Sequence, residues 1–240
     1  MLTREWGQAA CGLAFLFAAS AVSAGSFAVN PVRATLSAKQ PVGSLVVQNN
    51  GSEPTVVQLE TVSWAQHDGK DVYEPTKEIL ATPPIFTIPA GGSQIVRVGI
   101  RRAAEPGREL TYRLFLQEVP QTKSDLQGLR VVLRVGIPVF VLPATTSSPS
   151  LKWQAMRTSD GSLRVRVTNS GNAHIQLARS KLMTGANTRA LVEQDVPAYV
   201  LAGQTREWLY KVNPLPASGV PLRVAAQTDL GDMSTELVVE

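Results

Sequence analysis

The sequence predicts an all-β protein built from two immunoglobulin-like (Ig-like) β-sandwich domains. Short apolar or alternating segments recur along the chain, turn residues separate them, and no stretch keeps a helical period of 3.6 residues. About seven such segments precede a break near residue 145 and about six or seven follow it. Each side of the break therefore has the number of strands expected for one Ig-like sandwich.

The predicted strands form two sets. Before the break they are Val32–Leu36, Val42–Val47, Val56–Val62, Ile95–Ile100, Tyr112–Leu116, Leu129–Val135 and Val139–Leu142. After it they are Leu163–Val167, Ile175–Leu177, Tyr199–Leu201, Glu207–Val212, Leu222–Ala226 and Glu236–Val239. One short helical turn is expected at Thr76–Leu80, ending at the Pro83-Pro84 pair.

The segment Ala144–Ser150 separates the two sets of strands. It is small, polar and punctuated by proline, as is typical of a linker. We therefore predict an N-terminal domain at 25–144, a linker at 145–148 and a C-terminal domain at 149–240. Each predicted domain has roughly 100 residues, which is enough to bury a core of its own.

Residues 1–24 are expected to be a cleaved signal peptide. Arg4 lies in a short polar start, Ala9–Ala19 is an apolar run, and Val22-Ser23-Ala24 supplies the small residues of a cleavage site. The apolar run is too short for a membrane-spanning helix. The alternative interpretation is an N-terminal anchor that is not cleaved. An export signal of this kind predicts a periplasmic location.

Composition narrows the class of protein further. The 240-residue chain has a formal net charge of +4 and is 44% hydrophobic. This excludes a disordered, highly charged tail protein and gives no strong case for a nucleic-acid partner. No later segment is long and apolar enough to span a bilayer, so no stable membrane insertion is expected. The single cysteine, Cys11, lies in the predicted signal, so a core rather than disulfides must stabilise the mature chain.

Motifs that would indicate catalysis or a metal site are missing from the sequence. The two histidines, His67 and His174, stand outside any metal-ligand spacing, and neither a G-x-S-x-G elbow nor a G-x-G-x-x-G loop after a strand occurs. We therefore expect no enzyme activity, no metal and no cofactor. The tryptophans Trp64, Trp153 and Trp208 are expected in the core or at a domain interface rather than in a sugar-binding platform.

The segment Gly128–Pro143 (GLRVVLRVGIPVFVLP) has an unusual pattern. Its first half alternates, so four apolar side chains share one face: Leu129, Val131, Leu133 and Val135. Gly136 and Pro138 then interrupt the alternation, and proline is confined to edges or bulges of sheets. Two interpretations stay open: a sandwich strand that switches sheets at a kink, or an exposed edge that is retained because another chain pairs with it.

Several short motifs occur in a characteristic order over nearly the whole chain after residue 24. They are FAVNPVR (27–33), NNG (49–51), TPPIF (82–86), PAGGSQIVRV (89–98), RE (108–109), YRLFLQEVP (112–120), IPVFVLP (137–143), NSGN (169–172) and TDLG (228–231). Together they resemble the periplasmic pilus-assembly chaperones of the PapD type. The sequences YRLFLQEVP and RVGIPVFV are most similar to those of the archaic branch of that family.

The resemblance implies two Ig-like domains set at an angle, as a boomerang. It also implies a chaperone that lends its last N-terminal-domain strand to a pilus subunit whose own sandwich lacks its final strand, which is one form of β-strand addition. The expected donor residues are Leu129, Val131, Leu133 and Val135. The expected partners are pilus or fimbrial subunits and an outer-membrane usher, and self-association of the free chaperone would cover its exposed edge.

The resemblance further implies a basic anchor for the terminal carboxylate of the subunit. Its first member matches Arg33, and a guanidinium can hold a carboxylate through two hydrogen bonds. Its second member, usually a lysine late in the donor strand, aligns with Pro138, so Arg134 is the nearest basic substitute. The alternative for either arginine is a solvated charge on a strand.

An interdomain charge link is the last feature implied by the resemblance. Glu109 and Asp229 match its acidic members, whereas Leu142 stands at the basic position, so the link is incomplete or uses another arginine such as Arg108. Two other function classes remain open. One is an Ig-like structural or ligand-binding module of the cell envelope, and the other is a hydrolase, which turnover abolished by His174→Ala would favour.

Overall fold

The computed structural model describes residues 27–120, 131–184 and 190–240. Those residues form seventeen β-strands and no helix, so the predicted all-β class is confirmed. The predicted signal peptide and the predicted donor residue Leu129 lie outside the described residues.

The N-terminal domain is a sandwich of two sheets. Its strands are β1 (Phe27–Asn30), β2 (Ala34–Leu36), β3 (Val42–Asn49), β4 (Thr55–His67), β5 (Lys70–Pro75), β6 (Ile79–Thr82), β7 (Ile85–Ile88), β8 (Ser93–Ile100), β9 (Leu110–Glu118) and β10 (Arg134–Val141). One sheet has the order β1-β3-β8-β6, and the other has the order β2-β10-β9-β4-β5, with β7 also paired to β4. Alternate side chains of both sheets meet in one apolar core, which includes the fully buried Leu45, Val96 and Leu114.

The C-terminal domain is a second sandwich with a core of its own. Its strands are β11 (Leu151–Arg157), β12 (Leu163–Asn169), β13 (Ile175–Thr184), β14 (Ala190–Val200), β15 (Thr205–Tyr210), β16 (Pro221–Thr228) and β17 (Gly231–Val238). The order β11-β12-β15 forms one sheet and β14-β13-β16-β17 the other. Trp153 lies in this core, with Trp208 packed against it, so the structural role expected for both tryptophans is confirmed.

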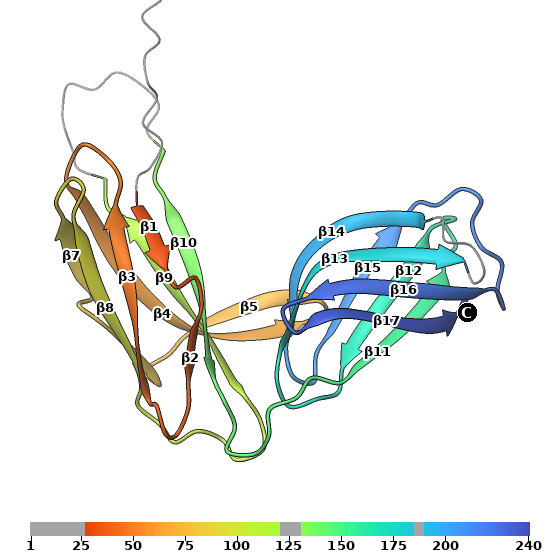
Figure 1. The fold of residues 1–240 in the computed structure, drawn as a ribbon, viewed down its shortest axis with the longest axis horizontal. Helices are drawn as coiled ribbons and strands as arrows, with labels where there is room; N and C mark the ends of the chain where they lie inside the picture. The colour runs from red at the N-terminus through yellow and green to blue at the C-terminus, as the bar shows by residue number, and fades with distance from the viewer. Residues whose placement is uncertain (1–26, 121–130, 185–189) are drawn as a thin grey trace, which may run out of the picture.

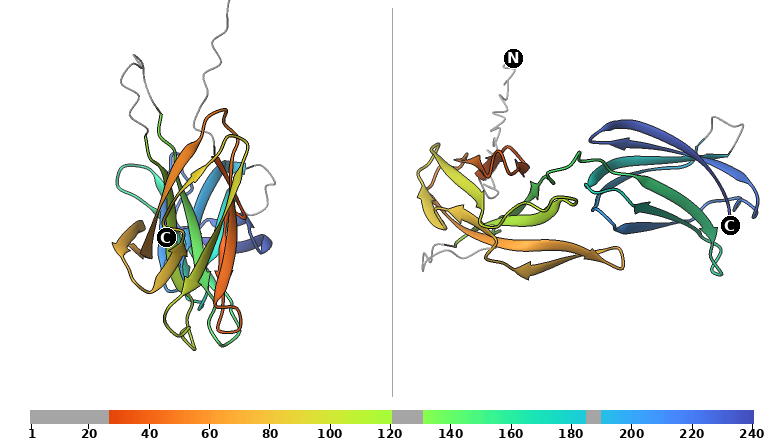
Figure 2. Two further views of the ribbon diagram at one scale, coloured as in Figure 1. Left: turned by 90° about the vertical axis from the view of Figure 1, so that its left-hand side faces the viewer. Right: turned by 90° about the horizontal axis from the view of Figure 1, so that it is seen from below.

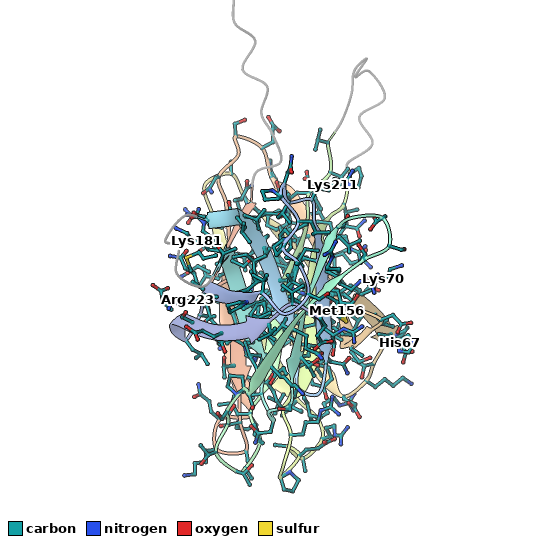
Figure 3. All side chains as sticks on the ribbon, turned by 90° about the vertical axis from the view of Figure 1, so that its right-hand side faces the viewer. His67, Lys70, Met156, Lys181, Lys211 and Arg223 are labelled. Carbon is teal, nitrogen blue, oxygen red and sulfur yellow. The ribbon has the colours of Figure 1, made fainter. Side chains whose placement is uncertain are left out.

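The two sandwiches meet at an angle, and the β4–β5 hairpin reaches across the junction (Figure 1). The view from below shows the same hairpin extending beside the C-terminal domain (Figure 2). Asp68 and Gly69 form its tip with φ angles of 49° and 72°, as a two-residue hairpin turn with left-handed residues requires. Figure 3 places His67 and Lys70 at this tip, on the flank of the C-terminal domain.

Two local predictions were wrong. The helical turn expected at Thr76–Leu80 is instead a bend followed by β6, because Ile79 and Ala81 alternate into the core with a period of two. The strand expected at Leu129–Val135 begins only at Arg134, and it runs unbroken through Pro138 to Val141. Pro138 is tolerated because one edge of β10 has no partner strand at that position in the described residues.

Candidate functional site

The most distinctive feature of the N-terminal domain is the unequal pairing of β10. Its whole length, Arg134–Val141, pairs with β9, but β2 pairs only with Val139–Val141. Over the described residues, the second edge of Arg134–Pro138 therefore carries no partner strand. The backbone groups along such an edge are available to an added strand.

The inner face of β10 continues the apolar core toward this edge. Ile137, Val139 and Val141 are buried in the core of the domain, and Leu133 and Val135 pack against its margin only partly buried. Val131 is 63% exposed. The apolar side chains thus become more accessible toward the start of the strand, and an added strand would cover them.

The outer face of β10 is covered by side chains from β9. Phe115 stands opposite Gly136, and a Cβ atom built on Gly136 would lie 2.9 Å from Phe115 Cε1. The Phe115 ring therefore occupies the space that a side chain at Gly136 would need. The Arg134 guanidinium lies 4.1 Å from the centre of the same ring and donates a 3.0 Å hydrogen bond to Glu60.

Arg113 lies on the same face of β9, directly opposite Pro138. Its guanidinium lies over the Trp64 ring, 4.0 Å from the centre, and Nη1 donates a 3.4 Å hydrogen bond to the Gly136 carbonyl oxygen. Its Nε is buried without an acceptor, and no carboxylate among the described residues pairs with it. A half-buried cation without a counterion favours a negatively charged ligand.

Arg33 lies at the junction of the domains, just before the strand that pairs with the end of β10. It immediately precedes Ala34, whose partner on β10 is Val139, the residue after Pro138. The positive charges of both arginines act on the Tyr199 hydroxyl and lower its pKa, although burial dominates and leaves that pKa raised overall. The Arg113 guanidinium lies 6.0 Å from the centre of the Tyr199 ring.

Arg33 is not free in this structure. Its Nη1 donates a 2.7 Å hydrogen bond to Asp229 Oδ2, and its side chain stays 41% exposed. Asp229 Oδ1 accepts a 2.9 Å hydrogen bond from the Gln176 backbone N–H, which fixes the carboxylate. An ion pair therefore joins the first N-terminal loop to the C-terminal domain.

His174 links the two acidic residues that the sequence singled out. Its Nδ1 lies 2.8 and 2.9 Å from the two carboxylate oxygens of Glu109, and its Nε2 lies 3.8 Å from Asp229 Oδ2. The His174 backbone N–H also donates a 3.3 Å hydrogen bond to Glu109 Oε1. The imidazole also stacks on Phe140, with ring centres 3.5 Å apart. His174 thus supplies the basic partner of the two carboxylates. The sequence has Leu142 at the expected basic position and suggested Arg108 as a substitute.

Further contacts join the domains around this link. Arg108 Nη2 donates a 2.9 Å hydrogen bond to the Ala202 carbonyl oxygen. Gln66 donates to the Tyr199 carbonyl oxygen at 2.9 Å and accepts from the Leu201 N–H at 3.1 Å. Trp64 belongs to a separate apolar cluster with Phe140 and Leu201, so its expected place at an interface is confirmed.

The structure thus groups some predicted residues and separates others. Arg33, Arg108, Glu109 and Asp229 all lie at the domain junction. Arg134 lies four residues before Pro138, about 13 Å away along the strand, beside Glu60. Arg113 and His174 were missed as members of this junction, because cross-strand register brings one to Pro138 and domain packing brings the other to Glu109.

Comparison with known families identifies the protein class. The family model "Pili and flagellar-assembly chaperone, PapD N-terminal domain" matches residues 26–147, more than half of the chain. The chain belongs to this chaperone family. No curated protein matches the sequence. The predicted resemblance to pilus-assembly chaperones is therefore confirmed at the level of the family.

Solved structures agree with the fold of this chaperone. A chain of the CsuC–CsuE chaperone–tip adhesion subunit complex of Acinetobacter baumannii matches with a TM-score of 0.64 at 22% identity, over 89% of this chain and 98% of that one. The CupB2 chaperone of Pseudomonas aeruginosa matches with a TM-score of 0.59 at 18% identity, over 89% and 100%. A chain of the SafA pilin–SafB chaperone complex of Salmonella enterica matches with a TM-score of 0.62 at 17% identity, over 91% and 98%.

Among the described residues, no group of three or more His, Cys, Asp or Glu side chains is placed to hold a metal ion. The same part of the chain contains no helix that is long and apolar enough to cross a membrane.

Proposed function

We propose that this chaperone binds pilus or fimbrial subunits in the periplasm by donor-strand complementation and delivers them to an outer-membrane usher. The observation that carries the proposal is the edge of Arg134–Pro138, which has no partner strand in the described part of the chain. This edge borders the domain core on its inner face and lies beside two arginines on its outer face. An extended segment of a subunit is the ligand that suits such a surface.

The edge would act by completing the sheet of the subunit. Backbone hydrogen bonds along β10 supply affinity, and Leu133 and Val135 enter the open core of the subunit, together with Val131 and Leu129 if the strand extends toward residue 129. Burying a side chain of this size removes about 1.5–3 kcal/mol of unfavourable hydration, before ordering costs are subtracted. The free energy comes from completing the fold of the subunit, so we propose that the protein needs neither catalysis nor a cofactor.

The terminal carboxylate of the subunit would bind at the domain junction. Arg33 supplies the first guanidinium there, and Arg113 is the better candidate for the second, because it faces Pro138 and has no carboxylate partner in the described residues. Arg134 remains the alternative suggested by the sequence. Two guanidinium groups could grip a carboxylate with several charge-assisted hydrogen bonds.

The remaining proposals concern the frame of the chaperone. We propose a mature chain with domains at 25–144 and 149–240, joined at 145–148 and exported by the signal at 1–24. The contacts of Arg108, Glu109 and Asp229 join the two domains of the free chaperone beside the anchor. Self-association of the free chaperone through the β10 edge would protect it before a subunit arrives.

Co-purification from the periplasm tests the proposed function. The wild-type chain and a candidate subunit are co-expressed, and the complex is recovered and identified by mass spectrometry. We expect Leu133→Arg, which places a charge at the margin of the core, and Arg33→Ala, which removes one anchor, each to lower the yield of the complex. An undiminished yield with both variants would contradict the proposal.

A further inference from the structure

The side chain of Asp229 is held in place by its own domain. It lies in the turn between β16 and β17, and its backbone N–H donates a 3.1 Å hydrogen bond to the Gln176 carbonyl oxygen. Its Oδ1 accepts the Gln176 N–H at 2.9 Å, which leaves Oδ2 directed at Arg33. The carboxylate is only 16% exposed, so its position is set before any ligand arrives.

The two arginines of the junction, Arg33 and Arg113, differ in whether a carboxylate neutralises their charge. Arg33 is already paired with a carboxylate of its own chain, whereas Arg113 has none among the described residues. A carboxylate that approached Arg33 end-on, through Nη1 and Nη2, would compete with Asp229 Oδ2, which accepts from Nη1 at 2.7 Å. It would also meet the negative charge of Asp229 itself.

We propose that Asp229 pairs with Arg33 in the free chaperone, and that the terminal carboxylate of the subunit replaces Asp229 at Arg33 when a subunit binds. This inference rests on the proposed function. Asp229 then opposes binding, because every incoming carboxylate must compete with a preorganised internal one. It assists release for the same reason, because Arg33 regains a counterion when the subunit leaves and no bare guanidinium remains.

This exchange makes the anchor select a subunit over a small free anion, which two unpaired arginines would not do. A small free anion gains only the exchange of one carboxylate for another at Arg33, whereas a subunit also gains the strand pairing along β10. Once Arg33 leaves Asp229, the carboxylate stays in place, with His174 Nε2 3.8 Å from its Oδ2. The charged or titratable groups that face His174 include Glu109, Asp229, Tyr199 and, through Asp229, Arg33.

A competition experiment tests the exchange. Differently tagged wild-type and Asp229→Asn chaperones are co-expressed with one pilus subunit in limiting amount, and the share of subunit bound to each is measured. Asparagine keeps the oxygen that accepts from Gln176 N–H but removes the charge. Asp232→Asn, an exposed change of equal charge three residues away, is the matched control. The same comparison is repeated in an Arg33→Ala background.

We expect Asp229→Asn to hold about two to five times more subunit than wild type, the factor for losing a partly exposed charge pair. The control should take an equal share, and the advantage should disappear in the Arg33→Ala background, which a purely structural role of Asp229 would not predict. An equal or smaller share for Asp229→Asn, or an advantage that persists without Arg33, would overturn the exchange while leaving the chaperone function intact. Failure of the wild type to capture any subunit would remove both.

Discussion

Arg113 on β9 stands directly opposite Pro138 on β10, so the neighbouring strand places a cation beside the position where β10 itself has a proline. The guanidinium lies over Trp64, with its carbon 4.0 Å from the ring centre, and its Nε has no acceptor. Stacking on an aromatic face holds the group without neutralising it. Arg113 is therefore both positioned and available for a carboxylate.

Replacement of Arg113 should disable the anchor more than replacement of Arg134. We expect Arg113→Gln to lower subunit capture about tenfold or more, because removing one member of a desolvated charge pair leaves the other unpaired. Arg134→Gln should change capture little, since Arg134 is half exposed and already bonded to Glu60. Pull-down of a co-expressed subunit measures both, with the exposed Arg97→Gln as control. The reverse order of effects would restore Arg134 as the second anchor.

The sequence was sufficient to predict the fold class because its signal is distributed. Many short alternating segments each contribute, so an error in one does not change the class. Local errors arose where two patterns compete, as at Ile79, where a polar turn and a buried period-two strand overlap. At Pro138 two predicted strands are one continuous strand, because the proline lies on an edge that has no partner there in the described residues.

The candidate site was less predictable for a physical reason. Residues such as Arg33 lie within a local motif and can be recognised from it. Arg113 and His174 become relevant only through partners that are distant in sequence, Pro138 and Glu109. Single-sequence patterns do not contain cross-strand register or domain packing, so neither residue carried a signal strong enough to separate it from an ordinary strand or loop residue.

The two faces of the strand segment around β10 should differ in their contribution to capture. Val135 faces the margin of the core next to the free edge, whereas Val132 is 38% exposed. We expect Val135→Ser to reduce the yield of chaperone–subunit complex strongly, because an apolar contact worth about 1.5–3 kcal/mol is lost. Val132→Ser should preserve the yield. Equal losses would contradict insertion of the inner face, provided that thermal unfolding shows both variants to be folded.

Gly136 should be intolerant of a side chain because Phe115 fills its space. A Cβ atom there would lie 2.9 Å from Phe115 Cε1 and 3.3 Å from Cδ1, so the ring must move. We expect Gly136→Val to lower the free energy of unfolding by about 1–3 kcal/mol, as overpacking does. Urea unfolding measures the change. Gly107→Val, at a position with no atom within 4 Å of a new Cβ, should be nearly neutral, and adding Phe115→Ala should relieve the loss at Gly136.

Alkaline pH should destabilise the folded chain through its tyrosines. The pKa values of Tyr73, Tyr112, Tyr199 and Tyr210 are all raised, chiefly by burial. In the unfolded chain a tyrosine releases its proton near pH 10, whereas the folded chain retains it. The unfolded state then binds fewer protons, so stability is fully present below about pH 10 and falls as the pH rises further.

Tyr112 should contribute most to this loss, because burial and a 2.8 Å hydrogen bond to Glu78 Oε2 together raise its pKa furthest. Tyr112→Phe should cost about 0.5–1.5 kcal/mol at pH 7 through the lost hydrogen bond. It should lose stability less steeply above pH 10, where one ionising group contributes at most about 1.4 kcal/mol per pH unit. Urea unfolding followed by tryptophan fluorescence between pH 7 and 12 measures both slopes. Parallel slopes for the two proteins would show that Tyr112 does not drive the alkaline transition.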